Sequence, residues 1–170
     1  MASQCAVATL PEEARFRIEA PNSRPRTIKV IALDCLSERS VERLANLEWN
    51  GATFFTASAF SVIAPGEQRF SVDGWLKDLG GRTKDLIDEV STADLVVMVA
   101  AAGEEGQAAS IIGEACSLKR VTTTALVLSD ATVSEETLSR TLAPLRPWAL
   151  MLVVANEEDY VADMLASLRA

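Results

Sequence analysis

Apolar and polar positions along the chain fall into alternating blocks of two kinds. Near-continuous apolar runs, typical of strands buried on both faces, occupy residues 27–34, 52–60, 95–101, 122–129 and 149–155. Between them, apolar residues recur every three or four positions, which predicts helices at 37–49, 83–92, 105–118, 134–145 and 156–168. The alternation predicts an α/β fold: a three-layer sandwich with a mostly parallel sheet of about five strands.

The pattern leaves two strand orders open, the Rossmann-like order and the flavodoxin-like order. Residues 1–26 contain three prolines and little periodicity, so we interpret them as a partly flexible N-terminal arm. Residues 27–170 are predicted to form a single α/β domain. Within it, the glycine-rich stretch 62–81 is predicted to be irregular.

Charge and cysteine content narrow the classes of partner. The net charge of −8 disfavours binding to nucleic acid or to an anionic membrane. No apolar run is long enough to predict a membrane span, and the N-terminus carries no export signal. The three cysteines lack metal-ligand spacing, so we expect reduced thiols and a cytoplasmic protein.

Candidate chemistry is sought where the strands end, because ligands of open α/β sheets bind beyond the carboxyl ends of the strands. The chain has no histidine, which excludes Ser-His-Asp triads, Cys-His dyads and histidine metal sites. No catalytic residue is predicted. The ligand-binding candidates follow the first, second and third apolar runs: Asp34, Cys35, Ser37, Ser58, Gly103, Glu104, Glu105, Gly106 and Gln107.

The strand ends are rich in carboxylates and poor in cations. Most of these acids are expected to complement helix macrodipoles. Glu104 and Glu105 would then weaken the attraction of their helix start for a phosphate group. An alternative is that Asp34, Glu104 and Asp130 together hold Mg²⁺, which prefers oxygen ligands.

Two stretches of the chain resemble the nucleotide-binding half of the tubulin/FtsZ family. They are "IKVIALDCLSERSVERLANLEWNGATFFTASA" and "STADLVVMVAAAGEEGQAASIIGEACSLKRVTTTALVL", within residues 28–130. The resemblance implies a Rossmann-like domain and a phosphate loop at "AGEEGQA". That loop keeps only Gly103 and Gly106 of the family's glycine cluster, so it implies a degenerate nucleotide-binding site.

Three hypotheses for function follow. The first is a non-catalytic Rossmann-like domain that binds a protein partner or self-associates in a regulatory or assembly role, with no cofactor expected. The second is a Mg²⁺-dependent nucleotide-binding switch or hydrolase that uses the strand-end carboxylates. The third is a small-molecule sensor with a pocket lined by Cys35, Ser58 and Gly103.

Overall fold

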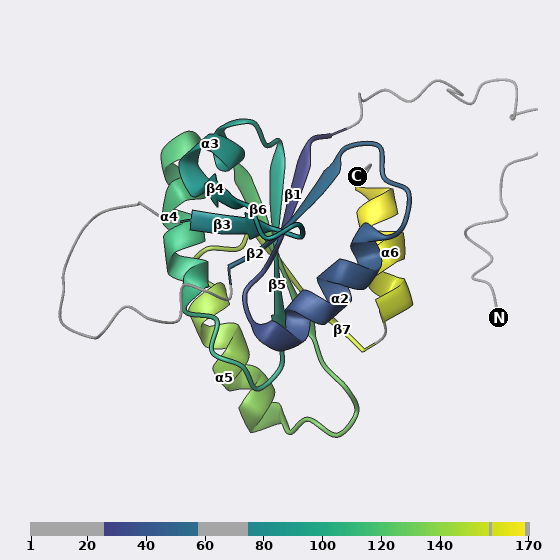
Figure 1. Ribbon diagram of the computed structural model, residues 1–170. Helices are drawn as coiled ribbons and strands as arrows, with labels where there is room; N and C mark the ends of the chain where they lie inside the picture. The colour runs from purple at the N-terminus through teal and green to yellow at the C-terminus, as the bar shows by residue number, and fades with distance from the viewer. Residues whose placement is uncertain (1–25, 58–74, 157, 169–170) are drawn as a thin grey trace, which may run out of the picture.

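The computed structural model describes residues 26–57, 75–156 and 158–168 (Figure 1). The predicted arm therefore lies outside the described residues, except for Arg26. The strands are β1 Ile28–Ala32, β2 Ala52–Thr56, β3 Trp75–Asp78, β4 Thr83–Asp85, β5 Leu95–Ala101, β6 Thr122–Leu128 and β7 Met151–Ala155. The helices are α2 Cys35–Ala45, α3 Leu86–Ser91, α4 Ala108–Lys119, α5 Glu135–Leu145 and α6 Glu158–Ser167.

The strands form one sheet in the order β4-β3-β2-β1-β5-β6-β7. Strands β2, β1, β5, β6 and β7 are parallel, whereas β3 and β4 pair antiparallel at one edge. Numbered by themselves, the parallel strands follow 2-1-3-4-5, the flavodoxin-like order. The predicted α/β class and mostly parallel sheet are therefore confirmed.

The predicted number of strands was wrong, because the sheet has seven. Strands β3 and β4 contain four and three residues, and part of each carries charge, so no apolar run marks them. They also displace two predicted boundaries. Stretch 62–81 includes β3, and helix α3 begins at Leu86 rather than at residue 83 because Thr83–Asp85 pairs in the sheet.

Helices cover both faces of the sheet (Figure 1). Helices α2 and α6 pack on the face that includes Ile28, Val30 and Val97, while α3, α4 and α5 pack on the face that includes Ile31 and Met98. Alternate residues of β1 and β5 thus enter different cores, as the two-residue period of a strand requires. Of the helices in the described part of the chain, none is long and apolar enough to cross a membrane.

The central strands β1 and β5 are completely apolar on both faces apart from Lys29, and every residue of β1 and β5 is buried. Burial of this kind contributes roughly 1.5–3 kcal/mol for each large aliphatic side chain. Because β1 and β5 occupy the centre of the sheet, the points at which the following loops begin are held in fixed positions. Those loops form the site described below.

One helix contact explains a glycine in the middle of α4. Gly113 faces the indole of Trp148, and a Cβ atom placed on Gly113 would lie 2.5 Å from both Cγ and Cδ2 of that ring. Glycine costs about 1 kcal/mol relative to alanine inside a helix, so its presence here is explained by packing and not by helix propensity. The α4 backbone can therefore approach Trp148 more closely than any residue with a side chain would permit.

We expect Gly113→Ala to destabilise the fold by about 2 kcal/mol, since overpacking against a rigid ring outweighs the gain in helix propensity. Urea denaturation measures the loss as a lower midpoint with an unchanged slope. Gly106→Ala is the matched control, because its added Cβ would lie at ordinary distances of 3.6 and 3.7 Å from Leu33 and Leu145. Equal midpoints for the two variants would contradict this account of the packing.

Candidate functional site

A pocket of about 510 Å³ lies at the carboxyl ends of β1, β2 and β5. The connections leave β1 and β5 toward opposite faces of the sheet, with α2 on one and α4 on the other, so this is the point where the strand order reverses. Its walls are the residues after each strand together with the start of α4. They are Leu33, Asp34, Cys35, Leu36, Ala57, Gly103, Glu104, Glu105, Gln107 and Ala108.

Asp34 is a buried wall residue and the N-cap of α2. Its Oδ1 accepts hydrogen bonds from the backbone amides of Leu36 at 3.0 Å and Ser37 at 2.7 Å. Its Oδ2 accepts a third, at 2.9 Å, from the amide of Ala101 at the end of β5. The carboxylate therefore joins the first turn of one helix to the neighbouring strand.

Ser37 completes this arrangement from inside the helix. Its hydroxyl accepts a hydrogen bond from the backbone amide of Asp34 at 3.2 Å and donates one to the carbonyl of Asp34 at 3.0 Å. Asp34 and Ser37 together form a capping box. Ser37 is fully buried, so its hydroxyl serves the helix start and does not face a ligand.

The opposite wall is the loop from Gly103 to Gln107. Gly103 has a φ of +97°, a conformation that side chains disfavour, and its amide donates to the hydroxyl of Thr141 on α5 at 2.9 Å. Glu105 accepts a hydrogen bond from the side chain of Gln107 at 2.8 Å. The loop delays the start of α4 to Ala108, three residues later than predicted, and no side chain caps that helix.

The same loop separates the pocket from a neighbouring hollow of about 300 Å³ against α5. That hollow contains a cation, Arg140, which is exposed and pairs with Glu136 at 3.4 Å. Gly106 is buried and lines this hollow rather than the larger pocket. Thr137, Thr141 and Pro144 complete its α5 side.

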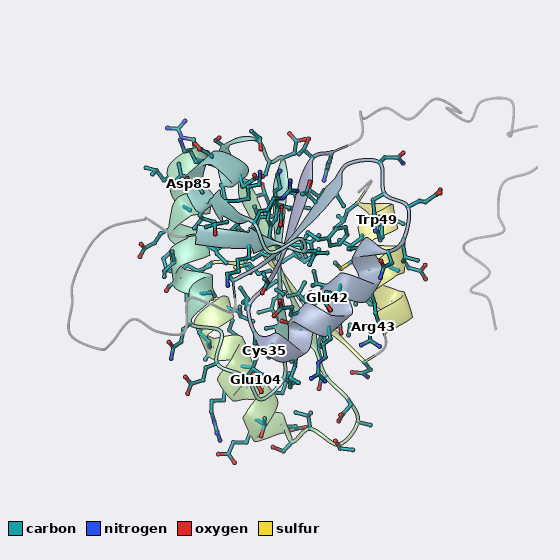
Figure 2. The ribbon with its side chains drawn as sticks, in the orientation of Figure 1. Cys35, Glu42, Arg43, Trp49, Asp85 and Glu104 are labelled. Carbon is teal, nitrogen blue, oxygen red and sulfur yellow. The ribbon has the colours of Figure 1, made fainter. Side chains whose placement is uncertain are left out.

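The two thiols in the described residues have different surroundings. Cys35 is exposed at the first turn of α2, and Figure 2 shows it beside Glu104 at the same end of the molecule. Cys116 is buried in α4, and burial raises its pKa to about 12. Only Cys35 can therefore report on the pocket by reacting with a thiol reagent at neutral pH.

The structure brings together most of the ligand-binding candidates named from the sequence. Asp34, Cys35, Gly103, Glu104, Glu105 and Gln107 line one pocket, whereas Ser37 lies behind it and Gly106 faces the neighbouring hollow. Ser58 lies outside the described residues. The sequence prediction missed the apolar lining, Leu33, Leu36, Ala57 and Ala108, although their positions directly after strands or at a helix start were a usable signal.

The structure does not bring together the three residues of the alternative Mg²⁺ site, Asp34, Glu104 and Asp130. Asp130 lines a separate hollow of about 250 Å³ at the ends of β6 and β7, away from Glu104. Its Oδ1 accepts hydrogen bonds from the amide of Thr132 at 2.8 Å and from the Thr132 hydroxyl. No group of three or more cysteine, aspartate or glutamate side chains within the described ranges is placed to hold a metal ion.

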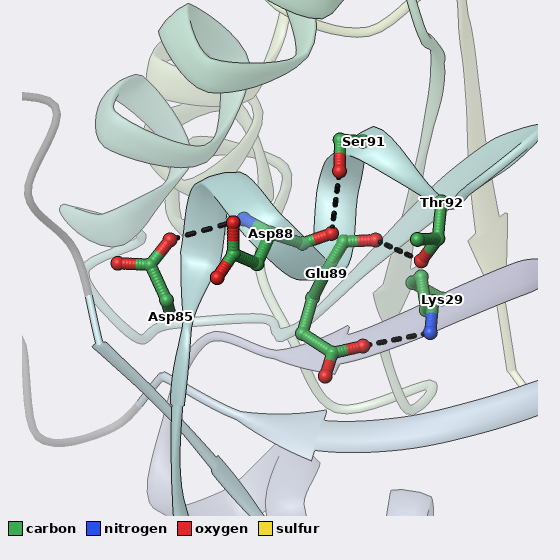
Figure 3. A network of polar contacts seen from close by, with 6 residues as sticks. All are labelled: Lys29, Asp85, Asp88, Glu89, Ser91 and Thr92. Carbon is green, nitrogen blue, oxygen red and sulfur yellow. Dashed lines mark hydrogen bonds and ion pairs between the residues drawn. The ribbon is translucent and has the colours of Figure 1, made fainter.

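A buried cation is found at the other end of the sheet, where β1 begins. Lys29 donates to Glu89 of α3 at 2.7 Å (Figure 3). Its Nζ also lies 5.5 Å from the centre of the Phe55 ring. The Lys29 side chain is only 9% exposed, so its charge is neutralised within the protein. This pair stabilises the contact of α3 with the sheet and supplies no positive charge to the pocket.

No protein-family model matches the chain, and no curated protein matches it. Among solved structures, one that matches is the apo-form of the flavoprotein from Lactobacillus acidophilus NCFM. The TM-score is 0.44 and the identity is 11%, and the match covers 82% of this chain and 99% of that one. The resemblance to the tubulin/FtsZ family stays a prediction that these comparisons do not test.

These findings correct the predicted function and the predicted absence of a cofactor. The sequence favoured a non-catalytic domain that acts through protein binding, with a Mg²⁺-dependent nucleotide switch as an alternative. The strand ends enclose a pocket of ligand size, and one of the matching solved structures is named as a flavoprotein. The missing phosphate-loop glycines were taken to favour a protein-binding domain, so a small-molecule pocket was only the third of the three hypotheses.

We expect Thr132→Ala to raise the pKa of Asp130. The Thr132 hydroxyl and then its amide hold that pKa below its ordinary value by donating to the carboxylate. The stabilisation that a lowered pKa provides is present above the unfolded-state pKa and is lost as the pH falls through the folded-state pKa. At neutral pH the variant therefore loses the part of this stabilisation that the Thr132 hydroxyl provides.

Carboxyl-detected NMR titration measures this pKa shift directly. Asp78 is the internal control, because its pKa is lowered mainly by a hydrogen bond from the Arg82 backbone and should be the same in both proteins. An Asp130 pKa that does not move in Thr132→Ala would show that the Thr132 hydroxyl is not a cause of the lowered pKa.

Proposed function

We propose that this chain binds a ring-bearing organic cofactor of the flavin type in the pocket at the ends of β1, β2 and β5. The observation that carries the proposal is the pocket itself. Its volume of about 510 Å³ falls within the range of small-molecule sites, roughly 300–1,000 Å³. Its position, at the reversal of strand order, is where open α/β sheets bind ligands.

The chemistry of the lining supports a ligand with a ring. Leu33, Leu36, Ala57 and Ala108 provide apolar surface, and the backbone of Gly103 and the side chain of Gln107 add polar groups at the rim. Ligand pockets combine a mostly apolar surface with a few placed polar groups in this way. The lining suits a ring system and does not suit a phosphate, because no lysine or arginine is among the described residues that form it.

The flavodoxin-like strand order supports the same location for a ligand. The matching flavoprotein determines only which compounds to test first, since the argument for a ligand rests on the pocket. Riboflavin is the appropriate first probe because it carries the flavin ring without a phosphate.

We expect riboflavin to bind saturably and to protect Cys35 from alkylation. The experiment uses a Cys5→Ser background, so that Cys35 and Cys116 are the remaining thiols. At a riboflavin concentration of about ten times Kd, the alkylation rate of Cys35 should fall about tenfold, because only free protein reacts. Cys116 should stay unmodified with or without the ligand, as its burial and raised pKa require.

A blocking variant locates the ligand independently of the thiol. Cys35→Trp places a bulky side chain at the pocket wall and should abolish riboflavin binding. Leu118→Trp is the matched control, since Leu118 is 66% exposed on α4 and does not line the pocket. Binding that survives Cys35→Trp, or no saturable riboflavin binding at all, would contradict the proposal.

A further inference from the structure

The hydrogen bonds of Asp34 bear on which ligands the pocket accepts. Three backbone amides, those of Leu36, Ser37 and Ala101, point at its two carboxylate oxygens from 2.7 to 3.0 Å. Two belong to the start of α2, an eleven-residue helix, and the third to the end of β5. Amides that converge from a helix N-terminus and a neighbouring segment are the arrangement by which proteins bind phosphate.

Here the protein's own carboxylate occupies that arrangement. Asp34 is 7% exposed, and its carboxylate takes the hydrogen bonds that a ligand anion would need. A phosphate placed in the pocket would find these amides already engaged. It would also lie near a buried negative charge, at a distance where like charges repel with little screening.

The other charged residues that line the pocket are also negative. Glu104 and Glu105 are on the opposite wall, and the described lining contains no lysine or arginine. Arg140 lines the neighbouring hollow, where Glu136 partly neutralises it. Among the described residues, the pocket thus offers apolar surface for a flavin ring and no cation for the phosphate of a flavin nucleotide.

We propose that Asp34 is a built-in substitute for a ligand anion, so that the pocket binds ligands without a phosphate group, either neutral or cationic. The selectivity rests on the proposed function, namely that the pocket holds an organic ligand. That Asp34 occupies the three amides does not depend on the proposed function. The two parts are therefore tested separately.

The first experiment removes the carboxylate and supplies an anion from solution. Asp34→Gly leaves the three amides without an acceptor, which lowers the melting temperature. Formate or inorganic phosphate should then raise the melting temperature of Asp34→Gly by several degrees more than that of the wild type, at ionic strength matched with chloride. Matching with chloride and comparing with the wild type removes the general stabilisation by excluded salts.

Asp85→Gly is the control, because Asp85 also caps a helix but accepts from a single amide, that of Asp88 at 3.0 Å (Figure 3). It should show no anion effect beyond that of the wild type. Should Asp34→Gly fail to fold, Asp34→Ser keeps a capping oxygen for α2 while it frees the Ala101 amide, and it should show a smaller anion effect. If anions raise the melting temperatures of the Asp34 variant and of Asp85→Gly equally, Asp34 does not take the place of a ligand anion.

The second experiment compares riboflavin with FMN, which differ only in the phosphate. We expect the wild type to bind riboflavin at least about tenfold more tightly than FMN, and Glu104→Gln to narrow the ratio by removing one like charge. If FMN binds as tightly as riboflavin or more tightly, the proposed selectivity is overturned. If this FMN binding is then lost in Arg140→Gln, the phosphate lies in the neighbouring hollow. If neither flavin binds, the proposed function and the selectivity fail together, while the anion experiment still decides the role of Asp34.

Discussion

The geometry of the ligand end of this molecule depends on one carboxylate. Asp34 accepts hydrogen bonds from the first turn of α2 and from the last residue of β5, and so joins two segments that are 67 residues apart in sequence. A charged acceptor shared by several amides makes stronger hydrogen bonds than a neutral one. This interaction joins the start of α2 to β5 and places a carboxylate in the pocket wall.

The fold could be predicted where the hydrophobic pattern was long and unambiguous. The seven-residue run Leu95–Ala101 is apolar throughout and is the central strand β5, while the 3.6-residue period after Asp34 is α2. Strands β3 and β4 could not be predicted in this way. They are three or four residues long and they carry charge. Strand β3 forms on the edge of β2, and β4 on the edge of β3, and these edges exist only in the folded sheet.

The sequence predicted where the site lies, but it did not predict what Asp34 does there. Asp34, Glu104 and Gly103 were named because they follow strands, and the folded chain places all three around one pocket. What Asp34 does there depends on the Ala101 amide, a neighbour that no local pattern reveals. In the same way, Asp130 follows a strand but belongs to a different hollow, because β6 is one strand farther from β1 than β5 is.

The two walls of the pocket differ in how firmly they are held. On one wall, Asp34 is buried and joins α2 to β5. The opposite wall, Gly103–Gln107, is mostly exposed and is attached to α5 through the Thr141 hydroxyl. Segments with few buried contacts open at a lower free energy than the core does. The loop wall is therefore the side of the pocket that opens at the lower free energy, and its position depends on Thr141 in α5, a residue that does not line the pocket.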